Sequence, residues 1–476
     1  MSMRKSLVWN YGAHFLVFAV TLGSTIVVSR LLTPHELGIF SVGIAISGLL
    51  GTLSYFGVAN YLIRDQALSE QTLATGFTVN AIMCLVVGAI LWQLGTIGQP
   101  LFSDPAIPRV LLWLALVPVI GIFEFLPATL LTREMQFGRT SLLQLGKATF
   151  NAVGVVGFAH QGWSYLSPAF GAVIGAAFGA LGYSIVGRRH VRLRLSLQGA
   201  RVLAVFSAQM ISAGGIPLVA ARIAELIIAQ FLGLSALGLY TRASGLAAMV
   251  WDGAYGLSTR IIYVQMAAEL RDTGSLRETF LRATKLLTAV MWPVMAGIAV
   301  LSAPIIQLLY GAGWEGAALP LSILMAGQFV MIGFAMNWEL CVLTNRTAWQ
   351  ARTEVTRAVI GLAAFAAGAL LSLPAAALGR VVDAVFGYLI YRPRMADMAG
   401  ATSAEIGDAN NGSLVLTPLA IGPAIGLMVV SRWSPAVPMG QIAIAVVAGG
   451  ALWMFALYAT RHPLFKELVS LARPWK

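Results

Sequence analysis

Apolar stretches of membrane-spanning length recur along this 476-residue chain. A helix needs about 20 apolar residues to cross a hydrocarbon core of roughly 30 Å, and most of these stretches are that long. Only 11% of the residues are charged, whereas soluble proteins carry about 25%. We therefore predict an all-α polytopic membrane protein, because a β-barrel would show short alternating segments instead. The fourteen predicted spans are residues 12–32, 37–59, 73–95, 108–131, 141–160, 165–187, 203–232, 237–261, 281–301, 317–343, 355–372, 374–391, 414–431 and 438–459.

Basic residues concentrate between alternate spans. With the N-terminus inside, most of the 31 Lys and Arg residues fall on the cytoplasmic side, which is the usual bias of membrane proteins. The bias predicts that both termini are cytoplasmic. The same bias accounts for the net charge of +12. Membrane lipids are therefore the expected partners of the basic residues, and nucleic acid is not.

Two internal echoes divide the chain into similar halves. Residues 37–41 read LGIFS and residues 237–241 read LGLYT, each beside a long apolar stretch. The second echo pairs LT at 131–132 and RT at 139–140 with LT at 343–344 and RT at 352–353. Six spans per half make the repeats parallel, as in transporters built from two similar lobes. The predicted divisions are a first six-helix lobe (1–187), a basic cytoplasmic linker (188–202), a second six-helix lobe (203–392), a flexible cytoplasmic linker (393–413), and two extra spans with a cytoplasmic tail (414–476).

Arginine residues within the spans are the first candidates for function, because ionisable groups in a bilayer usually face a partner or a water-filled cavity. Arg222 and Glu225 share one helix face, and Arg380 and Asp383 repeat that spacing. Each pair is either a self-neutralised structural pair or a cavity arginine whose counter-ion is released when an anionic ligand arrives. Arg242 has no partner at short spacing, so it either binds such a ligand or extends outward to the interface.

Two carboxylates and a polar helix stripe are further candidates. Glu124 and Glu339 occupy nearly matching places in the two halves, where they either carry a coupling proton or cation or simply accept hydrogen bonds. A stripe on the first span is a predicted cavity-lining face, with Arg30 at its side. Its members are Asn10, His14, Thr21, Thr25 and Ser29. The aromatic residues near the outer ends fit an interfacial belt: Trp163, Tyr165, Tyr240 and Trp314.

Several classes of protein are disfavoured. The chain has no GxxxxGK[ST] loop and no HExxH or CxxC motif, so neither nucleotide hydrolysis nor a metal site or cofactor is predicted. A membrane-embedded polysaccharide polymerase or ligase would need a large outer loop with catalytic charges, and the predicted outer loops are short. The expectation is therefore a protein without enzymatic activity.

The chain resembles Wzx-type polysaccharide flippases, and in particular the colanic-acid-exporter-like branch of the multidrug/oligosaccharidyl-lipid/polysaccharide (MOP) exporter superfamily. The resemblance rests on NYG at 10–12, SRLLTP at 29–34 with ELG at 36–38, ELII at 225–228 with LG at 232–233, LGLY at 237–240 with RA at 242–243, and YG at 310–311 followed by Trp314. The branch usually has Asp where this chain has Glu225, so the carboxylate is kept.

The resemblance implies two six-helix lobes around a central cavity that opens alternately to each face of the bacterial inner membrane. The cargo would be an undecaprenyl-pyrophosphate-linked oligosaccharide, whose headgroup would contact Arg222, Arg242, Arg380 and Arg30. Glu225 and Asp383 would then be counter-ions, and Glu124 and Glu339 candidate coupling sites. Other polysaccharide-assembly proteins are candidate partners. The alternative within the superfamily is a cation-coupled multidrug exporter, which would favour acidic cavity residues over basic ones.

Overall fold

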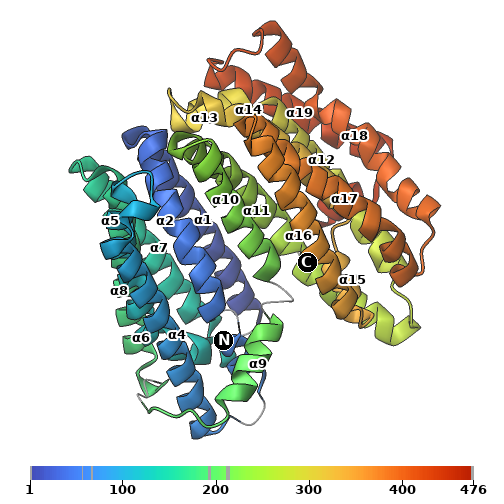
Figure 1. Cartoon of the computed structure of the whole chain (residues 1–476). Helices are drawn as coiled ribbons and strands as arrows, with labels where there is room; N and C mark the ends of the chain where they lie inside the picture. Colours follow the sequence, from blue (N-terminus) through green and yellow to red (C-terminus); the bar gives the residue numbers. More distant parts are fainter. Residues whose placement is uncertain (1–2, 56, 66–67, 191–193, 211–214, 473–476) are drawn as a thin grey trace. The chain divides into compact units, whose positions relative to one another are not determined.

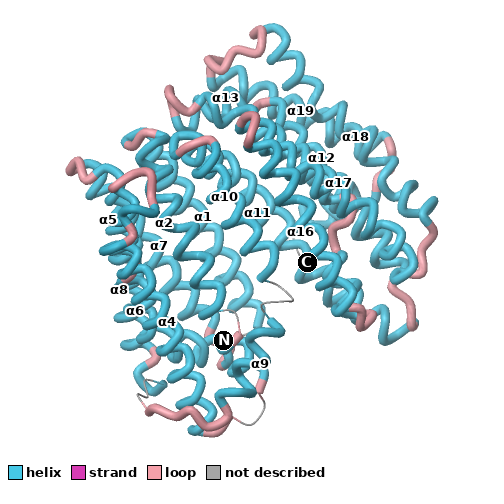
Figure 2. Tube along the Cα trace, viewed as in Figure 1, coloured by secondary structure: helices cyan, strands magenta, loops and turns pink. Residues whose placement is uncertain are grey.

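The computed structural model describes residues 3–55, 57–65, 68–190, 194–210 and 215–472. These residues form helices joined by short turns, with no strand among them (Figures 1 and 2). The predicted all-α class is thus confirmed. The helices divide into two compact units, Met1–Gly238 and Leu239–Lys476.

The N-terminal unit is a bundle of long helices with shorter ones at its ends (Figure 1). Its helices are α1 (Met3–Leu31), α2 (Pro34–Tyr55), α3 (Val58–Arg64), α4 (Glu70–Ile97), α5 (Ala106–Leu114), α6 (Leu116–Arg133), α7 (Phe137–His160), α8 (Ser167–Val186), α9 (Ala200–Met210), α10 (Ile216–Phe231) and the first turn of α11 (Leu234–Thr273). Prolines in the first turns of α8 and α10 suit positions whose N–H has no partner within the helix.

The C-terminal unit contains the rest of α11 and nine further helices. They are α12 (Arg277–Val300), α13 (Ser302–Tyr310), α14 (Ala318–Ile332), α15 (Asn337–Leu343), α16 (Thr347–Ala369), α17 (Leu373–Ala399), α18 (Ser403–Val430), α19 (Met439–Ala459) and α20 (Pro463–Ala472). A core centred on the fully buried Phe280, Phe334 and Tyr391 ties α12 to α17. The helix α18 packs on both α12 and α19.

Ten of the fourteen predicted spans coincide with segments that are long and apolar enough to cross a membrane among the described residues. The other four coincide with α1, α10, α11 and α16, which are also helical. Helix α1 has 29 residues and is apolar over Phe15–Leu31, and α10 has 16 residues. The chain is therefore a multi-pass membrane protein.

The two segments of the first echo fold into the same helix–turn–helix element. Helices α1 and α10 end at Leu31 and Phe231, and α2 and α11 begin at Pro34 and Leu234, so the two copies correspond residue for residue. Thr33 and Glu36 cap the first copy, with the Thr33 N–H donating to the Glu36 carboxylate at 2.7 Å. The second copy turns instead at Gly233, whose φ is +84°.

The two echo segments also contact each other. A Cβ on Gly38 would overlap the backbone of Leu234, and a Cβ on Gly238 would overlap the backbone of Pro34. The contact is reciprocal, as expected for two copies related by a local two-fold axis. Glycine at both positions permits this backbone-to-backbone approach.

The basic segment after α8 is attached to the N-terminal unit. Arg194 pairs with Glu70 at 2.9 Å, and the Thr75 hydroxyl donates to the Gln198 carbonyl at 2.8 Å. This segment was predicted to separate the halves, yet the division of the structure falls at Gly238, after α10 has packed on α2. Residues 191–193 of this stretch lie outside the described residues.

The predicted flexible linker at 393–413 is mostly helical, which corrects that expectation. Helix α17 continues to Ala399, and α18 begins at Ser403 after a left-handed turn at Gly400. Thr402 caps α18 in a capping box with Glu405. The polar composition of this stretch therefore belongs to helix ends.

Candidate functional site

Arg222 and Glu225 pair on α10 as predicted. The Arg222 guanidinium donates to both carboxylate oxygens of Glu225, at 3.0 and 2.9 Å. The side chain of Arg222 is 34% exposed and that of Glu225 13%. Gly48 of α2 leaves room for the arginine, since a Cβ there would lie 2.9 Å from its Nε. The cation is thus partly accessible beside α2 while its counter-ion is largely covered.

Arg242 of α11 lies against two aromatic rings. Its guanidinium carbon is 6.0 Å from the Tyr310 ring centroid and 5.9 Å from that of Trp314. Both rings are almost fully buried, and the Arg242 Nε has no hydrogen-bond partner among the described residues. The structure therefore joins two motifs that are separated in the sequence, LGLY with RA at 237–243 and YG with Trp314 at 310–314.

The same contacts change the interpretation of the aromatic belt. Trp314 is 2% exposed and Tyr240 3%, and Tyr240 packs edge-on against Phe365 at 5.5 Å. These two rings are core residues of the C-terminal unit, which corrects the interfacial assignment. Trp163, in contrast, is 47% exposed, as an interfacial residue would be.

Asp383 has a cationic partner that its spacing in the sequence did not indicate. Its carboxylate accepts a hydrogen bond from Arg357 of the neighbouring helix α16 at 3.2 Å. The guanidinium of Arg380, three residues before it, lies over the Phe365 ring at 5.4 Å. Arg380 and Asp383 therefore do not form an isolated pair, because Asp383 also bonds Arg357.

Arg357 and Asp383 belong to a buried charge network that the sequence interpretation missed. Arg357 is 7% exposed and bonds Glu354 at 3.0 Å as well as Asp383, and the Tyr391 hydroxyl donates to Glu354 at 2.7 Å. The Phe334 ring lies under the guanidinium at 5.1 Å. Arg357 lies near the start of the predicted span 355–372, whereas α16 begins earlier, at Thr347, and places it well inside the helix. The Glu354–Arg357 spacing, equal to that of Arg222–Glu225, was the available signal.

Glu124 is paired, and Glu339 is not at the matching place. Lys147 of α7 bonds both oxygens of Glu124, at 2.8 and 2.7 Å, and Gly179 of α8 leaves room for the pair. Glu339 is 5% exposed, and its Oε2 has no hydrogen-bond partner among the described residues.

The turns that follow α6 and α15 have the same conformation, so they show which residues of the two halves correspond. Met135 and Asn345 both have positive φ, and Gln136 and Arg346 close the two turns with equivalent backbone hydrogen bonds. This register matches Lys147 with Arg357. It matches Glu124 with Phe334, and this corrects the expected correspondence between Glu124 and Glu339.

The stripe on the first span is described only in part. Ser29 is buried and donates to the Thr25 carbonyl at 2.7 Å, while Thr21 and Arg30 are exposed. The side chains of Asn10 and His14 lie outside the described residues. Thr21 is thus an exposed member of the predicted cavity face, and Arg30 is exposed beside that face.

Three of the arginines share one property at the level of helices. Arg222, Arg242 and Arg357 lie on α10, α11 and α16, none of which counts among the long apolar spans of the described residues. Arg380, Asp383, Glu124 and Glu339, in contrast, lie on segments that do count as such spans. Helices that face a hydrated cavity can carry such charges, whereas helices that face lipid cannot. Each unit therefore carries an arginine that could meet an anionic group within the membrane, Arg222 in the N-terminal unit and Arg242 in the C-terminal unit.

Comparison with known sequences identifies related proteins. Residues 27–319 match the model of the family described as polysaccharide biosynthesis protein. The chain is 23% identical over 330 residues to the lipopolysaccharide biosynthesis protein WzxC of Escherichia coli (strain K12), which covers 68% of this chain and 67% of that protein. It is 22% identical over 424 residues to the teichuronic acid biosynthesis protein TuaB of Bacillus subtilis (strain 168), covering 84% of this chain and 83% of that protein.

Solved structures with the same fold are membrane transport proteins. The lipid II flippase MurJ, in an inward closed conformation, superposes with a TM-score of 0.70 at 13% identity, covering 97% of this chain and all of that chain. An inward-facing multidrug resistance MATE family transporter of the MOP superfamily gives a TM-score of 0.61 at 15% identity, covering 81% of this chain and 96% of that chain. At these identities the likeness concerns the fold alone.

Proposed function

The chain belongs to the polysaccharide biosynthesis protein family, and we propose that it translocates an undecaprenyl-pyrophosphate-linked oligosaccharide across the bacterial cytoplasmic membrane. It would do so without enzymatic activity, by exposing a cavity alternately to each face. Both termini would lie in the cytoplasm. The oligosaccharide would be a repeat unit of an O-antigen or exopolysaccharide.

The observation that carries this proposal is the environment of Arg242. The guanidinium is held by the buried rings of Tyr310 and Trp314, and no carboxylate lies within ion-pair distance of it among the described residues. Aromatic faces hold the side chain in one orientation without neutralising its charge. A cation kept in this way is suited to a phosphate group, which a guanidinium can bind through two parallel hydrogen bonds.

Arg222 would contribute through exchange of partners. Its two hydrogen bonds to Glu225 neutralise the charge when no cargo is bound. An arriving pyrophosphate would compete for the same N–H groups. Arg380 and Arg30 are further candidates for headgroup contact, while Arg357 already has two carboxylate partners and would serve the structure.

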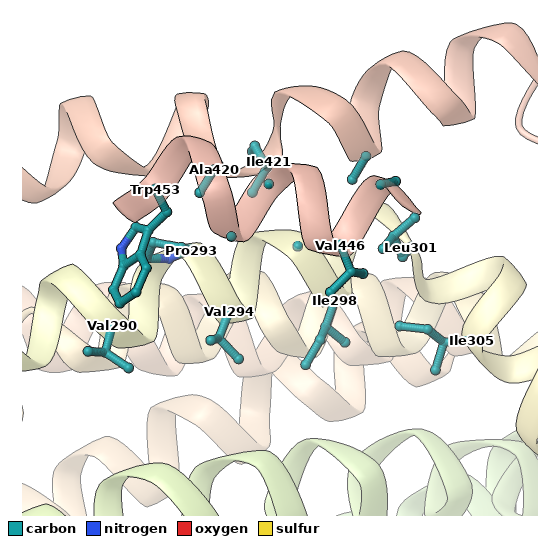
Figure 3. Close-up of a pocket in the computed structure, with 15 residues that line it drawn as sticks. Val290, Pro293, Val294, Ile298, Leu301, Ile305, Ala420, Ile421, Val446 and Trp453 are labelled. Carbon is teal, nitrogen blue, oxygen red and sulfur yellow. The ribbon is translucent and has the colours of Figure 1, made fainter. Parts of the chain in front are cut away.

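The lipid tail needs an apolar path, and the C-terminal unit offers one. A groove of about 340 Å³ runs between α12, α18 and α19 (Figure 3). Its walls are hydrocarbon side chains such as Val294, Ile298 and Val446, with Trp453 at one end. We assign this groove to the polyprenyl chain, by analogy with the two extra helices of lipid II flippases.

The alternative of a cation-coupled multidrug exporter is less well supported. Such an exporter would present acidic groups to cationic substrates, yet Glu124, Glu225 and Asp383 each bond a basic residue. Glu339 is the remaining candidate for a coupling proton, because one of its oxygens is buried without a hydrogen-bond partner among the described residues.

Substitution of Arg242 tests the proposal. In a strain that depends on this protein for polymer export, Arg242→Ala should reduce exported polymer by at least tenfold at unchanged protein level. Removal of one phosphate contact costs about 1.5–3 kcal/mol, which is a factor of that order. Arg242→Lys should retain part of the activity because it keeps the charge but loses the two-point geometry.

The control is Arg109→Ala, which removes an exposed arginine whose one hydrogen bond among the described residues is to the Tyr165 hydroxyl, at 3.4 Å. It should export normally. Undiminished export by Arg242→Ala would refute the headgroup assignment. Efflux of a cationic dye that is lost in Glu339→Gln, with polymer export intact, would favour the multidrug alternative.

A further inference from the structure

A charged cavity lies in the C-terminal unit, at the level where two spans end. It has a volume of about 420 Å³ and is formed by the first turns of α12 together with the segment from Arg461 to Glu467, which includes the start of α20. Its charged lining consists of Arg282, Lys285, Arg461, Lys466, Glu278 and Glu467. Four basic groups face two acidic ones, so the cavity is net positive.

One of the carboxylates is already used. Glu467 forms an ion pair with Arg282, and this pair joins α20 to α12. Among the described residues, Lys285, Arg461 and Lys466 have no carboxylate within ion-pair distance. The positive field also reaches the neighbouring histidine, since burial and the charge of Lys285 lower the pKa of His462. Three cations therefore converge with only Glu278 left to balance them.

The wall that carries these cations is firmly packed. Leu464 is buried against Ala289, Leu416 and Leu457, and Phe465 and Leu468 pack on the same cluster. The Leu464 N–H donates to Nδ1 of the buried His462 at 3.3 Å. Lys466 and Arg461 remain exposed on the other side of this segment. The short helix α20 is thus held as a fixed edge of the cavity.

The position of the cavity matches the zone of lipid phosphates. The span that contains α12 begins at Arg277 and the span formed by α19 ends at Ala459, so the cavity lies at one boundary of the membrane. The charge bias of the sequence predicts that this boundary is cytoplasmic. Basic pockets between spans on that side are typical sites for the headgroups of anionic lipids.

The cavity is separate from the apolar groove of Figure 3. The two share no lining residue: on α12 the cavity is lined at Arg282 and Lys285, and the groove begins at Val290. A phosphate headgroup at this boundary can come from the surrounding bilayer without its tail entering the groove.

We propose that the cavity between α12 and α20 binds the phosphate headgroup of an anionic bilayer phospholipid. Lys285, Arg461 and Lys466 contact the phosphate, and Arg282 holds α20 in place through Glu467. The site does not depend on the identity of the transported cargo. Bound lipid stabilises the packing of α20, α12 and α19 by linking α20 to the membrane surface.

The test uses the purified full-length protein in a neutral detergent, with its thermal unfolding followed during titration. Short-chain phosphatidylglycerol should raise the unfolding temperature, and short-chain phosphatidylcholine should not. The double variant Lys285→Gln/Lys466→Gln should weaken the phosphatidylglycerol response by about thirtyfold in concentration, because each basic residue near a charged lipid contributes about 1 kcal/mol. Arg109→Gln/Arg432→Gln removes two exposed arginines elsewhere and should respond like the wild type.

Other ligands separate the possible sources of the phosphate. Inorganic phosphate that gives the same shift at the same concentration would reduce the site to a simple anion site and overturn the lipid assignment. A shift with undecaprenyl diphosphate but none with phosphatidylglycerol would assign the cavity to the carrier lipid instead. If the double variant is too unstable to purify, the single variant Lys466→Gln, at an exposed position, replaces it. An unchanged phosphatidylglycerol response in that variant would contradict the proposal.

Discussion

Arg357 is a buried cation whose charge is balanced by Glu354 and Asp383, and it lies beside the stacked rings of Phe334 and Tyr391. The network joins α16 to α17 and orders their facing surfaces. Removal of one member of a buried ion pair is costly because the other charges remain buried without compensation. We therefore expect substitution of Arg357 to reduce the stability of the protein, and to reduce transport only as a consequence.

The prediction at this scale concerns Arg357→Ala. The variant should lose about 3–5 kcal/mol of stability, because two carboxylates would remain in the core without their cation. Thermal unfolding of the detergent-purified protein measures the loss, and protein level in the membrane should fall in parallel. Arg352→Ala, at an exposed position of the same helix, is the control and should be nearly neutral. Normal stability of Arg357→Ala combined with lost export would instead make Arg357 part of the transport site.

Residue pairs within one turn of a helix could be predicted from the sequence, and pairs between helices could not. Arg222 and Glu225 are three residues apart, so their pairing follows from helical geometry alone. Asp383 meets Arg357 only because α16 and α17 pack side by side, and a spacing of 26 residues carries no such information. The contact of Arg242 with Tyr310 and Trp314 was hidden for the same reason.

At the scale of helices, the reciprocal contact of Gly38 and Gly238 is the clearest product of internal repetition. Each glycine lets its helix approach the backbone that begins the other copy. Ala in place of either glycine must push the two backbones apart. We expect each of Gly38→Ala and Gly238→Ala to destabilise the N-terminal unit by about 1–3 kcal/mol, as overpacking does elsewhere. Thermal unfolding would measure this loss.

Gly245→Ala is the matched control for this experiment. Gly245 lies on the same helix as Gly238 and has no atom near the position of a Cβ. Ala there should be neutral or slightly stabilising, since Ala is favoured over Gly within helices by up to about 1 kcal/mol. Equal effects of Gly238→Ala and Gly245→Ala would show that the close approach has no energetic consequence.

Helix existence was easier to predict than helix ends. Over the residues that the structure describes, every predicted span is mostly helical, because long apolar stretches leave few alternatives in a membrane. Residues 393–413 were interpreted as a linker since they are small and polar, yet only residues 400–402 interrupt the helices. The sequence TSAE at 402–405 is a capping-box signature and could have predicted the start of α18.

Across the whole chain, polarity separates two kinds of helix. The helix α19 has no charged residue and the composition of a lipid-facing span, whereas α10, α11 and α16 carry charged groups and α1 carries a polar stripe. The sequence could predict this distribution, since it depends on composition alone. It could not predict that the compact units divide at Gly238, because that boundary depends on the packing of α10 against α2.

The two kinds of helix should differ in their access to water in a native membrane. Thr21 on α1 and Val447 on α19 are both exposed on the protein surface, so only the surrounding medium distinguishes them. We expect Thr21→Cys to react with a membrane-impermeant maleimide from one or both sides, because α1 would line the hydrated cavity. Val447→Cys should react only after detergent removes the lipid. The native Cys84 and Cys341 are buried, so the wild type gives the background. Equal protection of both new cysteines in membranes would contradict a hydrated path along α1, and with it the proposed route for the oligosaccharide.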